Sequence, residues 1–131
     1  MRRQSLRSEE GQGVVEFAFV LPLLLALVLG ICEFGILFNN YVTLTDATRV
    51  GARKATVSRF LGDNGAAAVV AARNAAPGLD PNKLVVTATS TDWQVAGSDV
   101  NVTASYPYSI NILGWVVTSG NLTSTTHERL E

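Results

Sequence analysis

The sequence predicts an α+β protein in which a long N-terminal transmembrane helix continues into a small head with a second helix and a three-stranded antiparallel sheet. Three observations predict this fold class. An apolar run extends from Val14 to Phe38, an alanine-rich segment covers Ala66–Ala76, and the C-terminal part alternates β-branched with small or polar residues. The chain has 131 residues, which leaves room for one small domain beside the helix.

Composition and charge exclude several classes of function. Ten basic and eleven acidic residues give a formal net charge of -1, which argues against nucleic-acid binding because that function needs a basic patch. Cys32 is the single cysteine of the sequence, so it cannot form an intrachain disulfide or a cysteine-based metal cluster. His127 is the single histidine, so we expect no histidine-based catalytic residues, no metal site and no cofactor.

The apolar run is long enough to cross a bilayer. From Val14 to Phe38, about 25 residues reach about 37 Å as a helix, against a hydrocarbon core of about 30 Å. A cleaved signal peptide would end at a small-x-small site, and the aromatic-rich segment Cys32–Phe38 that follows the richest apolar part contains no Ala-x-Ala. Ile31 before Cys32 also disfavours a lipoprotein cleavage site. The sequence therefore predicts a retained membrane anchor.

The charges beside the anchor indicate its orientation. Arg2, Arg3 and Arg7 precede the apolar run and favour a cytoplasmic N-terminus. Arg49 and Arg53 follow it and would favour the opposite orientation if they lay close to the membrane. We expect a single-pass protein of the cytoplasmic membrane, with its N-terminus inside and its C-terminal domain outside.

Two carboxylates interrupt the apolar run. A carboxylate at the centre of a membrane helix costs about 2.5–3.5 kcal/mol, so such residues are candidates for function. Glu33 lies near the far end, where it is a candidate interface residue at the outer leaflet. Glu16 lies near the inner edge, from which its side chain can also reach the headgroups. If the chain is cut between Gly11 and Gln12, Glu16 can pair with the new α-amino group of a neighbouring subunit.

The motif from Gly11 to Phe17 (GQGVVEF) resembles the class III signal sequence of type IV pilin-like proteins. Residues 11–53 are similar to TadE-like minor pseudopilins of the tight-adherence (Flp) pilus, and this similarity includes the segment from Ala47 to Arg53 (ATRVGAR). Phe17 stands where the major pilins of this system usually carry Tyr, which points to a minor pseudopilin. Ile36 departs from the family pattern, which often has a basic residue there.

The resemblance implies a division of the chain into three parts. Residues 1–11 would be a leader removed by a prepilin peptidase, residues 12–38 the transmembrane and assembly helix, and residues 39–131 an extracytoplasmic α+β domain. Gly11 and Gln12 would flank the cut, and Glu16 with Phe17 would serve recognition and assembly. The implied partners are the peptidase, the major Flp pilin, other minor pseudopilins, the assembly ATPase with its membrane platform, and membrane lipid. Adhesion and secretion are the implied uses.

The helical part of the chain has clear internal signals. We expect one helix from about Gly13 to Phe60, kinked at Pro22 because proline lacks an N–H and clashes with the preceding turn. Leu44 and Thr48 belong to a stripe at three- and four-residue spacing that should face the head. After a break at Gly62, Asp63 or Asn64 can cap the second helix, Ala66–Ala76.

Three strands are expected at Leu84–Thr89, Asp99–Tyr106 and Asn121–Arg129. Pro107 should end the second strand or lie at an edge. The apolar segment Ile110–Val117 is interpreted as core that packs against the helix. Two alternatives stay open, a loop that touches the membrane through Trp115 and a contact between subunits in which Trp115 is a candidate interface residue. The inward side chains of the last two strands should be Val100, Val102, Ala104, Tyr106 and Leu122.

The leading functional hypothesis is a structural pseudopilin that helps to assemble a surface filament. The alternative is an uncleaved, membrane-anchored module whose head binds a partner through the surface from Tyr106 to Val117. An enzyme is a distant third, because the head shows no convergent catalytic groups. The glycine-rich segment Gly62–Gly65 lacks the Lys-Ser/Thr that binds nucleotide phosphates, so we expect any motor to be a partner.

Overall fold

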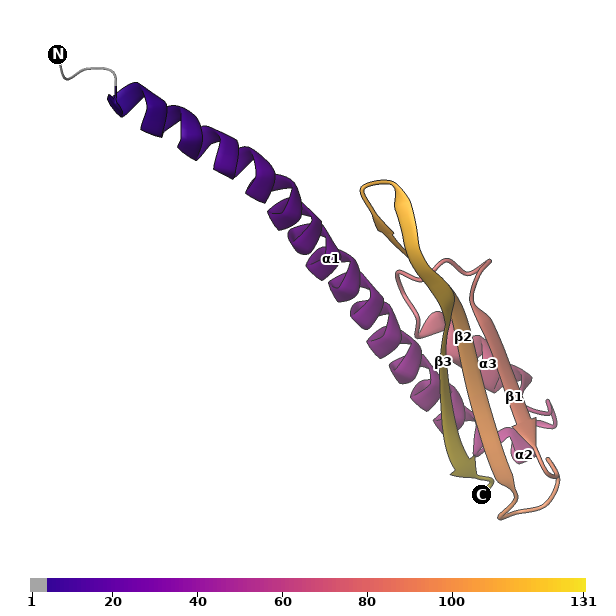
Figure 1. Cartoon of the computed structure of the whole chain (residues 1–131). Helices are drawn as coiled ribbons and strands as arrows, with labels where there is room; N and C mark the ends of the chain where they lie inside the picture. The colour runs from indigo at the N-terminus through magenta and orange to yellow at the C-terminus, as the bar shows by residue number, and fades with distance from the viewer. Residues whose placement is uncertain (1–4) are drawn as a thin grey trace.

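The computed structural model describes the backbone of residues 5–131 and the side chains of residues 11–131. Arg2 and Arg3 of the predicted leader lie outside the described residues, and so does the side chain of Arg7. A long helix projects away from a small head (Figure 1). The elements are α1 (Ser5–Ala55), α2 (Ser58–Leu61), α3 (Ala66–Asn74), β1 (Val85–Ser90), β2 (Asp99–Ile112) and β3 (Trp115–Arg129). The predicted fold class is therefore confirmed.

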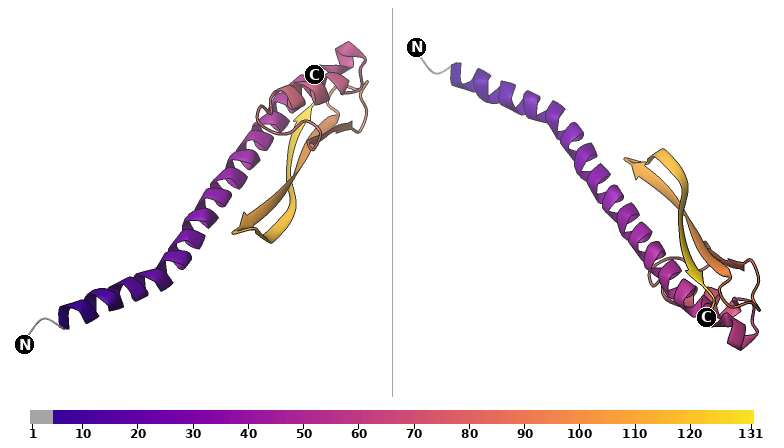
Figure 2. Two further views of the ribbon diagram at one scale, coloured as in Figure 1. Left: turned by 90° about the horizontal axis from the view of Figure 1, so that it is seen from above. Right: turned by 90° about the horizontal axis from the view of Figure 1, so that it is seen from below.

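Helix α1 runs without interruption through Gly11 and Gly13, and it begins earlier than predicted, at Ser5. Each glycine costs about 1 kcal/mol relative to alanine, which is too little to stop a helix of 51 residues. Pro22 lies inside α1. Figure 2 shows that the helix axis bends within the indigo-to-purple part that contains this proline, as its missing N–H predicts.

The C-terminal end of α1 differs from the prediction, because the helix ends at Ala55 and not at Phe60. The Thr56 carbonyl accepts a hydrogen bond of 2.9 Å from the N–H of Glu131, at the far end of the chain. The Thr56 hydroxyl donates to the Arg53 carbonyl at 2.9 Å. These contacts close the last turn, and the chain continues as the short helix α2. Gly62 follows α2 as its C-cap, in the left-handed region with φ +66°.

The three strands form one antiparallel sheet in the order β1-β2-β3. β1 pairs with the first half of β2, from Val85 opposite Ser105 to Ser90 opposite Val100. β2 and β3 pair along their whole length, from Asp99 opposite Arg129 to Ile112 opposite Trp115. Both strands are longer than predicted, and together they form a hairpin that extends beyond β1 (Figure 1).

Pro107 lies inside β2 and does not end it. Its position is tolerated because β1 pairs with β2 only as far as Ser105, so β2 has a single neighbour at Pro107 and is an edge strand there. The hairpin turns at Leu113 and Gly114, both with positive φ, as two-residue hairpin turns require.

The core lies between the C-terminal half of α1, helix α3 and the inner face of the sheet. Val100, Val102 and Ala104 of β2 are fully buried, and Leu122 and Tyr106 pack against them, as their alternation predicted. Leu44 and Thr48 of α1 face this core, whereas Arg49 and Arg53 lie on the exposed side. Thr48 also joins the helix to β3, because its hydroxyl accepts from the Thr126 hydroxyl at 3.0 Å.

Asp63 lies just before the start of α3. Its carboxylate accepts hydrogen bonds from the N–H groups of Gly65 at 3.1 Å and Ala67 at 2.7 Å. Burial raises the pKa of the Asp63 carboxyl, but these backbone hydrogen bonds lower it by more, so the pKa lies below its ordinary value. The N-cap position itself is occupied by Gly65, so the prediction of Asp63 or Asn64 is wrong in position, although the Asp63 carboxylate does bind an N–H group of the first turn.

The lowered pKa of Asp63 predicts a pH dependence of stability. Because the ionised form is favoured in the folded state, its stabilisation is present above the unfolded pKa of about 3.9 and is lost as pH falls through the lower folded pKa. Thermal melts of wild type and Asp63→Asn should therefore separate above about pH 4 and converge at lower pH. Melting temperatures that differ by the same amount at every pH would contradict this role.

Candidate functional site

The N-terminal half of α1 is an apolar helix that stands outside the head. Its exposed side chains include Phe17, Phe19 and Leu23, with Phe19 80% exposed. The helix is long and apolar enough to cross a membrane, and no part of its most apolar stretch is buried by the rest of the described protein. An apolar surface of this length is not stable in water. Helix α1 therefore fits a single-pass membrane anchor.

The residues around the predicted cut lie together on one face of α1. The side-chain amide of Gln12 donates a hydrogen bond of 3.0 Å to the carboxylate of Glu16, four residues later. Both side chains are exposed, as is Phe17 beside them. The structure thus brings Gln12 and Glu16 together, and the amide offsets part of the cost of placing a carboxylate at the inner edge of the apolar surface.

Gly11 and Gly13 are not required by packing. A Cβ atom built on either glycine would meet nothing within 4 Å. Glycine weakens a helix by about 1 kcal/mol relative to alanine, so the turn that contains the predicted cut is easier to open than the apolar turns that follow.

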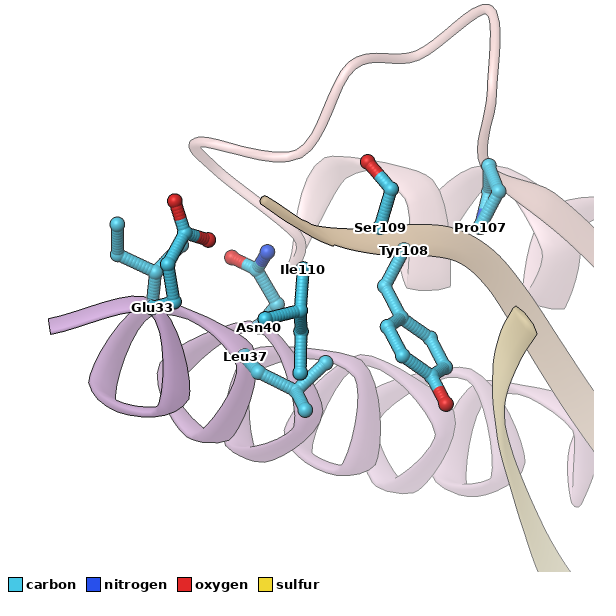
Figure 3. Close-up of a pocket in the computed structure, with 8 residues that line it drawn as sticks. Glu33, Leu37, Asn40, Pro107, Tyr108, Ser109 and Ile110 are labelled. Carbon is cyan, nitrogen blue, oxygen red and sulfur yellow. The ribbon is translucent and has the colours of Figure 1, made fainter. Parts of the chain in front are cut away.

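Glu33 is partly buried near the outer end of the anchor. It lines a small pocket between α1 and β2, together with Leu37, Asn40, Tyr108 and Ile110. In Figure 3 the side chains of Tyr108 and Ile110 point toward α1, whereas Ser109 and Pro107 point away from it. The head therefore reaches back along α1 as far as the second carboxylate of the apolar run.

The prediction that Ile110–Val117 forms part of the core is wrong for most of the segment. Trp115 is 82% exposed, and Leu113, Val116 and Val117 are also exposed. Only Ile110 and Ile112 are partly covered. The physical reason is the length of the hairpin, which extends past the end of β1 to a level where neither α3 nor another strand covers it (Figure 1).

Titratable groups in the described part of the chain do not form a metal centre, since no cluster of three or more His, Cys, Asp or Glu side chains lies there. Cys32 is exposed on the apolar part of α1. Asp46 and Arg49 form an ion pair of 3.3 Å on the exposed side of the same helix.

Comparison with protein families finds a likeness within α1. A family model described as TadE, TadE-like protein, matches residues 11–53. This segment is similar to the TadE-like family. The resemblance predicted from the sequence is thereby confirmed over the same residues, and it relates the chain to the tight-adherence pilus system. No curated protein and no solved structure matches the chain.

The limits of the TadE-like segment coincide with structural features. It begins at Gly11, the residue that precedes the predicted cut, and it ends at Arg53, within the last turn of α1. It covers neither α3 nor the sheet, so the likeness concerns the anchor and the part of α1 that carries the head.

The structure shows why glycine is needed at residue 51, a position on the stripe of α1 that the sequence predicted to face the head. A Cβ atom built on Gly51 would lie 2.9 Å from Ala72 Cβ and 3.1 Å from the Ala68 carbonyl oxygen of α3. It would also lie 3.0 Å from Val102 of β2. Gly51 therefore allows α1, α3 and the sheet to approach one another closely. The spacing of Leu44, Thr48, Gly51 or Ala52, and Ala55 predicted the inward face of α1, but it did not indicate that residue 51 must be glycine.

Proposed function

We propose that the protein is a minor pseudopilin of the tight-adherence (Flp) pilus, cut by a prepilin peptidase between Gly11 and Gln12. The observation that carries the proposal is the coincidence of three features at one place on α1. The TadE-like segment begins at Gly11, the Gln12–Glu16 hydrogen bond follows at once, and the exposed apolar surface starts there.

The contacts of Gln12 suggest how the cut changes the helix. In the uncut chain, the Gln12 side chain is a neutral partner for the Glu16 carboxylate. The cut creates an α-ammonium group at Gln12, which a neighbouring subunit can offer to Glu16. Opposite charges attract far more strongly in a low-dielectric environment than in water, although desolvation offsets much of this gain. Glu16 would thus favour subunits that are packed side by side in the membrane.

The exposed part of α1 then has a structural role. Its apolar side chains are exposed in the single chain. In an assembly they would pack against the helices of the major Flp pilin and of other minor pseudopilins. The assembly ATPase and its membrane platform would supply the movement. We place the N-terminus in the cytoplasm and the head outside the cytoplasmic membrane, and we assign the protein no catalytic step.

Mass spectrometry of the N-terminus tests the cut. We expect the protein extracted from membranes to begin at Gln12 in cells with an active prepilin peptidase, and to retain residues 1–11 in cells without it. A chain that retains these residues in both kinds of cell would contradict the proposal. It would support instead an uncleaved anchor whose head binds a partner.

Two glycine variants sharpen this measurement. Gly11→Val places a branched side chain next to the scissile bond and should leave most of the protein uncut. Gly13→Val is the matched control, because both glycines lie in the same exposed turn and a Cβ at either meets nothing within 4 Å. It should be cut as in the wild type. Equal processing of the two variants would show that Gly11 has no special role.

A further inference from the structure

We infer that the tip of the β2–β3 hairpin, residues 110–117, is a second membrane contact that seats its apolar side chains in the outer interface of the bilayer spanned by α1. The inference requires α1 to be a membrane anchor, but it does not depend on the cut at Gly11. The ligand is the lipid surface itself.

The side chains of the hairpin tip are unsuited to water. Leu113 is 66% exposed and Trp115 is 82% exposed, and Val116 and Val117 are exposed as well. Leu113 occupies a turn position with φ +52°, where hairpins in water usually carry Asn, Asp or Gly. A hairpin that ends in solvent would have a polar turn. This one presents a contiguous apolar end.

The distribution of charge favours lipid over an aqueous partner. From Val100 to Thr126 the sequence contains no Asp, Glu, Lys or Arg. The opposite end of the same strands is charged, with an exposed ion pair between Arg129 and Asp99 at 3.2 Å. Aromatic residues are common in protein interfaces as well as at the bilayer interface, but protein interfaces usually also contain Arg and have a polar rim, whereas the apolar side of the bilayer interface excludes charges. The exposed Trp115 and the uncharged hairpin tip fit the second environment.

The position of the hairpin tip along α1 indicates how deep the tip lies in the bilayer. A Cβ atom built on Gly30 would lie 3.8 Å from Ile112 Cδ1, so the hairpin reaches α1 at Gly30. From Gln12 to Gly30 the helix rises by about 27 Å, close to the thickness of a hydrocarbon core. With Gln12 at the inner edge, Gly30 therefore lies at the outer edge of the hydrocarbon core, and the apolar residues 31–38 of the predicted membrane segment continue into the outer interfacial region. Figures 1 and 2 show the hairpin pointing along α1 toward its N-terminal end, and hence toward this edge.

The two contacts together would hold the head in one orientation. A single helix allows the head to tilt and rotate about the point where it leaves the membrane. A hairpin tip seated beside Gly30 would remove most of this freedom, and the pocket lined by Glu33, Asn40 and Tyr108 would lie just above the lipid. The outer boundary of the hydrocarbon core would then fall near Gly30.

Quenching of tryptophan fluorescence tests the inference. The full-length protein would be reconstituted into vesicles of phosphatidylcholine and phosphatidylglycerol, with or without lipids brominated near the headgroup end of the acyl chains. In a Trp93→Phe variant, Trp115 is the only tryptophan, and we expect roughly a twofold loss of its emission in brominated vesicles because the apolar interface is its favoured place.

The second tryptophan provides the control. Trp93 lies in the loop before β2, at the end opposite the hairpin tip, and the 14 residues of β2 at about 3.4 Å each separate the two ends by about 45 Å. In a Trp115→Phe variant the emission of Trp93 should not respond to brominated lipid. Comparison of the wild type with Trp115→Phe isolates the signal of Trp115 even if Trp93→Phe destabilises the head.

Two outcomes would overturn the inference. Trp115 could be unaffected by brominated lipid and fully quenched by aqueous acrylamide, which would place the hairpin tip in water. Alternatively, it could be shielded from both quenchers, with the shielding increasing as the ratio of protein to lipid rises. That result would assign the hairpin tip to a contact with a second copy of the chain.

Discussion

Replacement of Glu16 by glutamine should reduce the amount of the protein in sheared pili at least tenfold, a loss of about 1.4 kcal/mol or more per subunit contact, while the amount in the membrane stays equal or rises. Glutamine keeps the shape of the side chain and can still accept a hydrogen bond from the Gln12 amide, which is 3.0 Å away in the wild type. It removes only the charge. Loss of the charge makes residence in the membrane easier, since an ionised carboxylate is disfavoured in the apolar part of the bilayer.

The measurement compares the protein in the pilus fraction with the protein in the membrane fraction by immunoblot. Glu33→Gln is the matched control, because it makes the same chemical change on the same helix at a carboxylate that lines the pocket against the hairpin. This control should assemble like the wild type. Pili with normal content of the Glu16→Gln variant would contradict the proposed pairing with a neighbouring α-amino group.

Replacement of Gly51 by valine should destabilise the head by about 3 kcal/mol, the upper range for overpacking in a close-packed core. The new side chain would begin 2.9 Å from Ala72 Cβ and 3.1 Å from the Ala68 carbonyl oxygen. Both obstacles belong to α3, and the carbonyl cannot move without disturbing that helix. The variant should therefore melt at a lower temperature, followed by circular dichroism in detergent, and its head should become sensitive to protease.

Gly35→Val is the control for this prediction. It lies on the same helix, but a Cβ atom at Gly35 would meet nothing within 4 Å. The stability of the head should not change in this variant. A Gly51→Val protein with the melting temperature of the wild type would show that α1 and α3 are less closely packed than the distances indicate.

Local patterns in the sequence were sufficient to predict the structural features that depend only on neighbouring residues. The apolar run before Phe38 predicted the membrane helix, and Pro22 predicted its bend, because both effects arise within one or two turns. The alternation of Val100, Val102 and Ala104 identified the inner face of β2, since side chains of a strand alternate regardless of what covers them. The motif from Gly11 to Phe17 was recognisable because its signal is a spacing along the chain.

Contacts between distant residues decided the rest. Helix α1 ends at Ala55 because the Thr56 carbonyl accepts a hydrogen bond from the N–H of Glu131. The residues around Thr56 contain no signal that predicts this distant partner. The hairpin tip was interpreted as core because its residues are apolar, yet a pattern of apolar residues does not specify which layer covers them. Only the relative lengths of β1, β2 and β3 leave Trp115 outside the head. The need for glycine at residue 51 likewise arises where three elements meet in space, and so the folded structure alone determines it.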